Sequence, residues 1–208
     1  MRKISILLFA ILLPGIGAFA QKKKFHLKLE YGMKIGMNGS HFYLHDLQEN
    51  NAPYIHTRWK TGFVLGAYVN MPLYKKISVQ PEFLYSGMGG TYYDIREADT
   101  KVKARYNYFS IPVLAKYKIS KKWAFIAGPQ FDFLIQGKER VGGKNHIVSD
   151  GLKDFDIGAT GGIEFWPVKR IFLSGRYMRG FNDVDYRADM MRYYMEGVQL
   201  TMGIKFSK

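Results

Sequence analysis

Histidines and carboxylates are the side chains of this chain that could do metal or nucleophilic chemistry. His41 and His45 are four residues apart and Asp46 follows directly, a spacing that on a helix could supply part of a metal site. This segment is expected to lie in a loop, where the spacing fixes no geometry. Nucleophilic catalysis needs a histidine held beside a serine or carboxylate, and no histidine here has such a neighbour at a clear strand end. The sequence therefore predicts no metal, no other cofactor and no enzyme.

Hydrophobic alternation shows which elements must position the charged groups. From residue 25 to residue 38 every odd position is apolar and no even position is. Strict period two over such a length indicates a long strand with one apolar face. Similar patterns recur at about 58–71, 77–88, 105–119, 123–136, 154–165, 170–181 and 198–206. The chain is therefore predicted to form eight strands, each longer than is usual in globular sheets.

The connections between these strands alternate in length. Long polar connections are expected at about 39–57, 89–104, 137–153 and 182–195, and short ones at 72–76, 119–122 and 166–169. This layout is typical of an all-β, eight-stranded antiparallel up-and-down transmembrane β-barrel, with short periplasmic turns and long outer loops. The alternative is a soluble lipocalin-like carrier, in which the apolar face would point inward around a ligand.

The polar face of the strands favours the membrane barrel. Its glycines, such as Gly32, Gly36 and Gly62, weaken strands but suit a lumen that is only just wide enough for side chains. Aromatic residues near strand ends, among them Trp123 and Trp166, are typical of interfacial belts. The polar face also carries charges of both signs, which could pair across a narrow lumen.

The predicted lumen charge network consists of Lys28, Glu30, Lys34, Lys60, Glu82, Lys116, Asp132, Asp156, Glu164 and Arg176. Its inward carboxylates could also be general acids or bases. Charge pairing inside the barrel explains them more simply, so we expect a structural role.

The N-terminus predicts export. Arg2 and Lys3 precede an apolar run at residues 4–13, and a small-x-small site precedes Gln21, so residues 1–20 are expected to be a signal peptide. The apolar run is too short for a transmembrane helix. Residues 21–208 are then one β-barrel domain in the bacterial outer membrane. The absence of cysteine excludes a disulfide framework and thiol chemistry.

The chain is strongly basic, and the charge is expected at one edge of the barrel. Removing the signal peptide takes away Arg2 and Lys3 and no acid, so the net charge falls from +14 to +12. The N-terminal segment, the short turns with their flanks and the C-terminal segment together hold twelve basic residues and no acid. The predicted periplasmic basic rim consists of Lys75, Lys76, Lys121, Lys122, Lys169 and Arg170. Such a rim suits anionic lipid headgroups or another envelope protein, or it merely solubilises the turns; nucleic acid is not an expected partner.

Three prolines fall inside predicted strands. Pro81, Pro112 and Pro129 lie in three successive strands at a similar distance from the short turns. Proline cannot donate to a β-ladder, and a closed barrel has no edge strand to accept it. We therefore expect bulges or locally broken ladder bonds at these positions.

Five segments of the chain carry a resemblance to a known family. They are "LEYGMKIGMNGS", "YNYFSIPVLAKYKI", "AFIAGPQFDFLI", "DFDIGATGGIEF" and "LTMGIKFSK". In this order and spacing they resemble strands of the outer-membrane β-barrel family common in Bacteroidota, often called PorT-like or porin family. The resemblance covers nearly all of residues 21–208. It implies an eight-stranded outer-membrane barrel and no single activity, although one relative acts in a protein-secretion system of the outer membrane.

The sequence thus predicts a non-catalytic integral outer-membrane protein with a structural or partner-binding role, exerted through its outer loops or its basic rim. The alternatives are a narrow porin and a secretion-system accessory barrel. A soluble carrier and an outer-membrane enzyme are less favoured. The carboxylates that an Asp/His enzyme site would use are expected in the outer loops: Asp94, Asp99, Asp183, Asp185 and Asp189. The expected partners are outer-membrane lipid, anionic headgroups at the periplasmic rim and other envelope proteins.

Overall fold

The protein forms a closed antiparallel β-barrel in a computed structural model, which describes residues 29–46, 55–94, 100–182 and 191–207. The elements are β1 Glu30–Asp46, β2 Ile55–Arg58, β3 Lys60–Tyr74, β4 Ile77–Asp94, β5 Thr100–Lys118, β6 Trp123–Val141, β7 Lys144–Ile147, the 3₁₀ turn η1 Ser149–Gly151, β8 Phe155–Val168, β9 Ile171–Gly180 and β10 Met191–Lys205. No helix in the described part of the chain is long and apolar enough to span a membrane.

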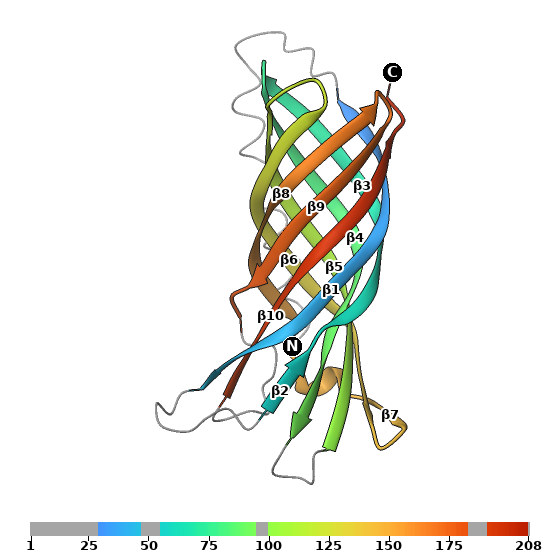
Figure 1. Ribbon diagram of the computed structural model, residues 1–208, viewed down its shortest axis with the longest axis vertical. Helices are drawn as coiled ribbons and strands as arrows, with labels where there is room; N and C mark the ends of the chain where they lie inside the picture. Colours follow the sequence, from blue (N-terminus) through green and yellow to red (C-terminus); the bar gives the residue numbers. More distant parts are fainter. Residues whose placement is uncertain (1–28, 47–54, 95–99, 183–190, 208) are drawn as a thin grey trace, which may run out of the picture.

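Eight long strands close the barrel. Each pairs with the next along the ring β1, β3, β4, β5, β6, β8, β9, β10, and β10 pairs back to β1. The two short strands lie outside this ring, where β2 pairs with β4 and β7 with β6. In Figure 1 the short turns and the C-terminus lie at the top, the short-turn end, whereas β2, β7 and η1 lie at the bottom, the loop end. The predicted eight-stranded barrel is confirmed.

Burial shows that the apolar face of the strands is the outer one. On β1, Met33, Ile35 and Met37 are 47%, 45% and 57% exposed, whereas the intervening Lys34 is 1% exposed. Charged residues inside and large apolar residues outside are the reverse of a soluble carrier and match a barrel that meets lipid. The lipocalin-like alternative is therefore wrong.

The strands are longer at the loop end than the sequence predicted. β1 extends to Asp46, β4 to Asp94 and β6 to Val141, and β5 begins at Thr100, all inside segments that were expected to be loops. Beyond the lipid both faces of a strand can be polar, so hydrophobic alternation disappears while backbone pairing continues. The barrel therefore projects paired strands out of the lipid-facing zone.

At the three prolines, where bulges or locally broken ladder bonds are expected, the structure shows no register shift. Pro81 pairs with Val113 and Pro112 with Gln130, so the prolines do lie at one level on β4, β5 and β6. The register is the same on both sides of each proline, although two pairs are skipped next to Pro81 and next to Pro112. A locally interrupted ladder thus accommodates the missing N–H groups without an inserted residue.

The register shifts lie elsewhere. They occur between Pro72 and Tyr74, between Phe165 and Val168, and opposite the Asn107–Tyr108 step of β5. At the last of these, Asn107 pairs with Gln136 and Tyr108 with Leu134, which leaves Ile135 of β6 as the extra residue. A bulge of this kind exchanges the inward and outward faces of the strand beyond it.

Side chains fill the lumen in two layers. The layer towards the short-turn end is polar and charged, as described below. The layer towards the loop end is an apolar cluster of Phe42, Met88, Ala104, Tyr106, Tyr108, Leu152, Met178 and Met195. Glycines make room for the rings here: a Cβ on Gly90 would lie 2.7 Å from Phe42. Inward glycines therefore serve a crowded lumen.

Candidate functional site

An ion-paired network crosses the lumen at its centre. Glu82 accepts from Lys34 Nζ at 2.7 Å and from Arg176 Nη1 at 2.9 Å. All three side chains are almost completely buried. The carboxylate on β4 thus lies between a cation from β1, two strands away around the ring, and a cation from β9, directly across the lumen. Pairing of this kind is what makes buried charge tolerable.

A second ion pair joins the first through an amide. Lys116 Nζ pairs with Glu164, and both side chains are buried. Gln80 Nε2 donates to Glu82 at 2.9 Å and to Glu164 at 3.0 Å, while its Oε1 accepts from Lys116 at 3.2 Å. Gln80 therefore links the two ion pairs into one network. Gln80 is not among the residues predicted from the sequence for this network, although it lies on the polar face of a predicted strand.

Asp132 and Asp156 form a separate acidic pair in the lumen. They are direct cross-strand partners on β6 and β8, 7% and 8% exposed. Gln130 Nε2 donates to both oxygens of Asp132, at 3.1 and 2.9 Å, and the backbone N–H of Asn182 donates to Asp156 at 3.0 Å. The cavity beside them measures about 20 Å³, enough for one water molecule. A cavity of this size admits no solute larger than a water molecule.

The remaining predicted lumen charges lie nearer the barrel ends. Glu30 pairs with Lys205 Nζ at 3.2 Å at the short-turn end. Lys60 donates to the carbonyl oxygen of Ala104 at 2.7 Å at the loop end. Lys28 lies outside the described residues.

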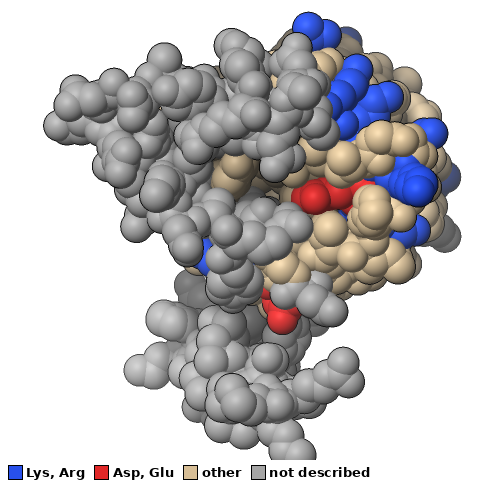
Figure 2. Space-filling view, turned by 90° about the horizontal axis from the view of Figure 1, so that it is seen from below, with Lys and Arg blue, Asp and Glu red and all other residues tan. Residues whose placement is uncertain are grey.

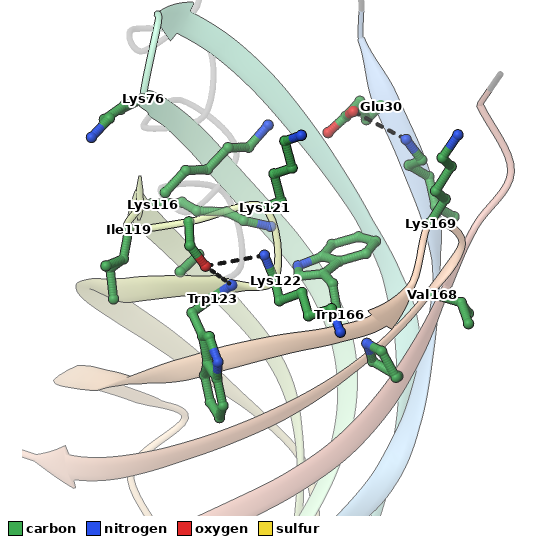
Figure 3. Close-up of a pocket in the computed structure, with 15 residues that line it drawn as sticks. Glu30, Lys76, Lys116, Ile119, Lys121, Lys122, Trp123, Trp166, Val168 and Lys169 are labelled. Carbon is green, nitrogen blue, oxygen red and sulfur yellow. Dashed lines mark hydrogen bonds and ion pairs between the residues drawn. The ribbon is translucent and has the colours of Figure 1, made fainter.

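A basic pocket opens above the central network, at the short-turn end of the barrel (Figure 3). This short-turn pocket has a volume of about 770 Å³, and Glu30 is the only acidic residue among the described residues that line it. Its lining lysines are Lys76, Lys116, Lys118, Lys121, Lys122, Lys169 and Lys205. Four of the six residues of the predicted basic rim belong to this lining, whereas Lys75 and Arg170 do not.

Two turns position the pocket lysines. Ser120 Oγ accepts from the backbone N–H groups of Lys122 and Trp123 at 3.2 Å, which closes the β5–β6 turn. The N–H of Trp166 donates to the carbonyl oxygen of Lys122 at 2.8 Å and ties this turn to the end of β8. Lys121 and Lys122 therefore stand on a braced turn opposite Lys169 of the β8–β9 turn.

Trp166 forms a wall of the pocket and is not part of an outer aromatic belt. Its ring packs on Phe172 with the centroids 4.6 Å apart, and Lys116 Nζ lies 4.8 Å from its centroid. Lys116 thus belongs to both the pocket and the central network. In contrast, Trp123 is exposed on the outer face, as an interfacial residue would be.

The pocket holds unpaired positive charge. Lys116 and Lys205 have carboxylate partners, in Glu164 and Glu30. The other five lining lysines form no ion pair with any residue that the structure describes. These five are Lys76, Lys118, Lys121, Lys122 and Lys169. Lysine is a point charge with three donors, suited to phosphate or carboxylate groups, so the pocket can bind an anion over a closed lumen.

The histidine segment is not a metal site in the part that is described. His41 Nε2 lies 2.9 Å from Glu196 Oε1, and its ring packs on Trp59 with the centroids 4.4 Å apart. These contacts account for His41 as a cross-strand partner at the outer surface. The side chains of His45, Asp46 and Asp94 lie outside the described residues, as do Asp99, Asp183, Asp185 and Asp189.

Comparison with known proteins agrees with this architecture. Residues 19–186 match the family model described as "Outer membrane protein beta-barrel domain". A comparison with curated proteins finds no match.

Several solved structures are similar to the chain. They include Ail, the attachment invasion locus protein of Yersinia pestis, at 11% identity, covering 86% of this chain and 100% of that chain with a TM-score of 0.48. Neisserial surface protein A matches at 9% identity, covering 84% and 97% with a TM-score of 0.47. The outer membrane protein OprG of Pseudomonas aeruginosa matches at 9% identity, covering 88% and 98% with a TM-score of 0.45. With the family model matching most of its length, the chain belongs to the outer membrane protein β-barrel domain family.

Proposed function

We propose that this chain is a non-catalytic, non-conducting outer-membrane barrel that binds anionic groups from the periplasm in its short-turn pocket. The observation that carries the proposal is a set of five lysines around one cavity of about 770 Å³, none of which forms an ion pair with a residue that the structure describes. Short turns face the periplasm in outer-membrane barrels, so the pocket opens to that compartment. The buried ion-paired network below the pocket favours a binding role rather than a role as a pore.

The chemistry of the pocket favours a compact anion as the ligand, rather than the flat surface of a lipid bilayer. Lys116, Lys122 and Lys169 surround a concavity at the mouth of the lumen, whereas a lipid-binding ring would have its charges on the outer wall. Phosphate or carboxylate groups on a soluble periplasmic molecule or polymer fit this arrangement. Anionic phospholipid headgroups, and a role as an accessory barrel in secretion, are the alternatives that a binding experiment separates.

Two finer assignments belong to this proposal. The motif order at residues 21–208 supports placement of the chain in the PorT-like branch found in Bacteroidota. The basic and apolar pattern of residues 1–20 supports a cleaved signal peptide. Mass determination of the protein isolated from outer membranes tests the second, because cleavage before Gln21 removes a defined mass.

A paired set of variants tests the pocket. Lys121→Gln with Lys122→Gln removes two pocket charges, and Lys75→Gln with Arg170→Gln removes two charges from the same rim outside the pocket. Pyrophosphate is titrated into the full barrel in a non-ionic detergent, and binding is followed by the fluorescence of the pocket tryptophans. We expect the pocket variant to bind about tenfold more weakly, a loss of about 1.4 kcal/mol, and the control to bind within about twofold of wild type.

Equal weakening by both variants would show a diffuse effect of the rim charge and reject the pocket. Binding to phosphatidylglycerol vesicles but not to pyrophosphate would assign the lysines to the membrane surface instead.

A further inference from the structure

The loop end of the barrel carries a second basic surface, which sequence analysis did not predict. Figure 2, viewed from the loop end, shows Lys and Arg side chains gathered on one side of the described part of the barrel. Six exposed residues on the outer faces of β2, β5 and β6 define this loop-end basic surface: Arg58, Lys101, Lys103, Arg105, Lys138 and Arg140. None of the six forms an ion pair with a residue that the structure describes.

Like charges face each other directly on this surface. Lys103 is the cross-strand partner of Arg140, and Arg105 is the partner of Lys138. Like charges at directly opposed positions destabilise a sheet. Two consecutive pairs of this kind indicate that an anionic partner compensates the charge when it is bound.

The bulge at Ile135 creates this arrangement. Beyond it Lys138 and Arg140 are exposed on the outer face, while Glu139 is buried and accepts from Tyr106 Oη at 2.8 Å. With an unshifted register, Glu139 would point outward and Lys138 inward. The bulge therefore moves a carboxylate into the lumen and two cations to the outer surface, the re-aiming of side chains that bulges produce near binding sites.

An aromatic ring holds two more of these cations in place. Arg58 lies 5.1 Å and Lys101 lies 5.4 Å from the centroid of the Tyr93 ring. Cation–π contacts orient both side chains without neutralising them. The surface is thus organised by neighbouring strands and keeps its full charge.

The height of the surface matches the outer headgroup layer. The outward side chains of β5 are apolar up to Phe109, polar at Asn107 and basic at Arg105, Lys103 and Lys101. At about 3.3 Å per residue and a strand tilt of about 40°, Arg105 lies roughly 10 Å beyond Phe109 along the membrane normal. Cations just outside the last lipid-facing aromatic residue meet headgroups before they meet bulk solvent.

We propose that the loop-end basic surface binds the phosphate groups of phosphorylated lipid headgroups in the outer leaflet of the outer membrane. The opposed pairs Lys103–Arg140 and Arg105–Lys138 form the centre of the site. Arginine binds phosphate through paired N–H donors and lysine through its compact charge. The site is independent of the short-turn pocket, which lies at the opposite end of the barrel.

Mixed micelles test this site on the full barrel. The protein is titrated, in octyl glucoside, with phosphorylated lipid A or with the same lipid after removal of its phosphates, and bound lipid per barrel is counted by native mass spectrometry. We expect Arg105→Gln with Lys138→Gln to weaken retention of the phosphorylated lipid about tenfold, because each basic side chain at an anionic surface adds severalfold to binding. A second variant, Lys103→Gln with Arg140→Gln, is expected to act in the same direction.

Lys75→Gln with Arg170→Gln is the matched control, because it removes one lysine and one arginine from the opposite end. It should retain the phosphorylated lipid as wild type does, and neither wild type nor variants should retain the dephosphorylated lipid well. Folding of every variant is checked by the shift between boiled and unboiled samples on a denaturing gel. Unchanged retention by both folded surface variants would overturn the proposal. The proposal would also be overturned if the surface bound a soluble sulfated glycan through these residues and did not bind the phosphorylated lipid.

Discussion

At the scale of residues, the lumen replaces the hydrophobic core that a soluble protein would have. Glu82 lies between Lys34 and Arg176, and Gln80 connects it to the Lys116–Glu164 pair. Removal of one partner from such a set leaves a buried charge without compensation, which is far more damaging than loss of a surface pair. The network therefore stabilises the barrel only as a complete set.

Glu82→Gln is expected to destabilise the barrel severely. It leaves both Lys34 and Arg176 facing a neutral amide, and the loss of a buried partner costs about 3–5 kcal/mol. Equilibrium urea unfolding in lipid vesicles, followed by tryptophan fluorescence, measures the change. Glu30→Gln is the control, because its pair with Lys205 is partly exposed and is expected to contribute about 1 kcal/mol or less. Similar losses in the two variants would contradict the central role of Glu82.

Asp132→Asn is expected to stabilise the barrel or leave it unchanged. The carboxylates of Asp132 and Asp156 are directly opposed, and relief of a like-charge cross-strand pair is worth up to about 1 kcal/mol. The asparagine oxygen can still accept from Gln130. The same urea titration checks this prediction, and a clear loss of stability would show that the pair shares a proton or binds a cation that the amide cannot replace.

At the scale of elements, the sequence was informative where the strands contact lipid and uninformative beyond it. Alternation predicted eight strands and placed Lys34, Glu82 and Arg176 on the inner face, because the lipid requires every outward residue there to be apolar. The signal disappears at the loop end, where β4 continues to Asp94 through a predicted loop. The basic rim was predicted, but its division into pocket residues and others, such as Lys75, depends on how two turns fold together.

The bulge could not be predicted from the three prolines. The ladder is interrupted next to Pro112, but the pairs on both sides of the gap have the same register, so no residue is inserted there. Ile135 is neither a proline nor a glycine, and Gly137, two residues beyond it, is one of many strand glycines and does not mark the shift in the sequence. Charge counting also could not reveal the second basic surface, because outside the twelve basic residues of the short-turn end the mature chain has 17 basic and 17 acidic residues, which sum to zero.

Deletion of Ile135 is expected to remove the bulge and to keep the faces of β6 beyond that point. The chain has no cysteine, so single cysteines report exposure directly. In the wild-type background Lys138→Cys should react rapidly with a membrane-impermeant maleimide, and Glu139→Cys slowly. In the deletion background the order should be the same, because Leu134 and Gln136 then follow each other opposite Tyr108 and Asn107, and Lys138 keeps its partner Arg105. An inverted order would mean that the pairing of β5 with β6 shifts instead, and that the pairing beyond the bulge does not set the outer surface.

At the scale of the whole molecule, the barrel is a closed body with charged sites at both ends. An eight-stranded barrel has a lumen only just wide enough for side chains, and here two different layers fill it. The polar layer around Glu82 lies below the short-turn pocket, and the apolar layer around Phe42 and Tyr106 lies towards the loop end. Because the two layers lie one behind the other along the lumen, the loss of either layer leaves the other one blocking the lumen.

Current measurements across planar bilayers test this series arrangement. Wild type is expected to show no conductance steps, and so is Lys116→Ala with Glu164→Ala, because the apolar layer still blocks the lumen. Phe42→Ala with Tyr106→Ala should also be silent, because the polar network remains. Only the variant that combines all four substitutions should conduct, provided that the boiled and unboiled gel shift shows it to be folded. Steps from the wild-type barrel would mean that water threads the network around Gln80, and the protein would then be a narrow pore whose lysine pocket selects anions at its mouth.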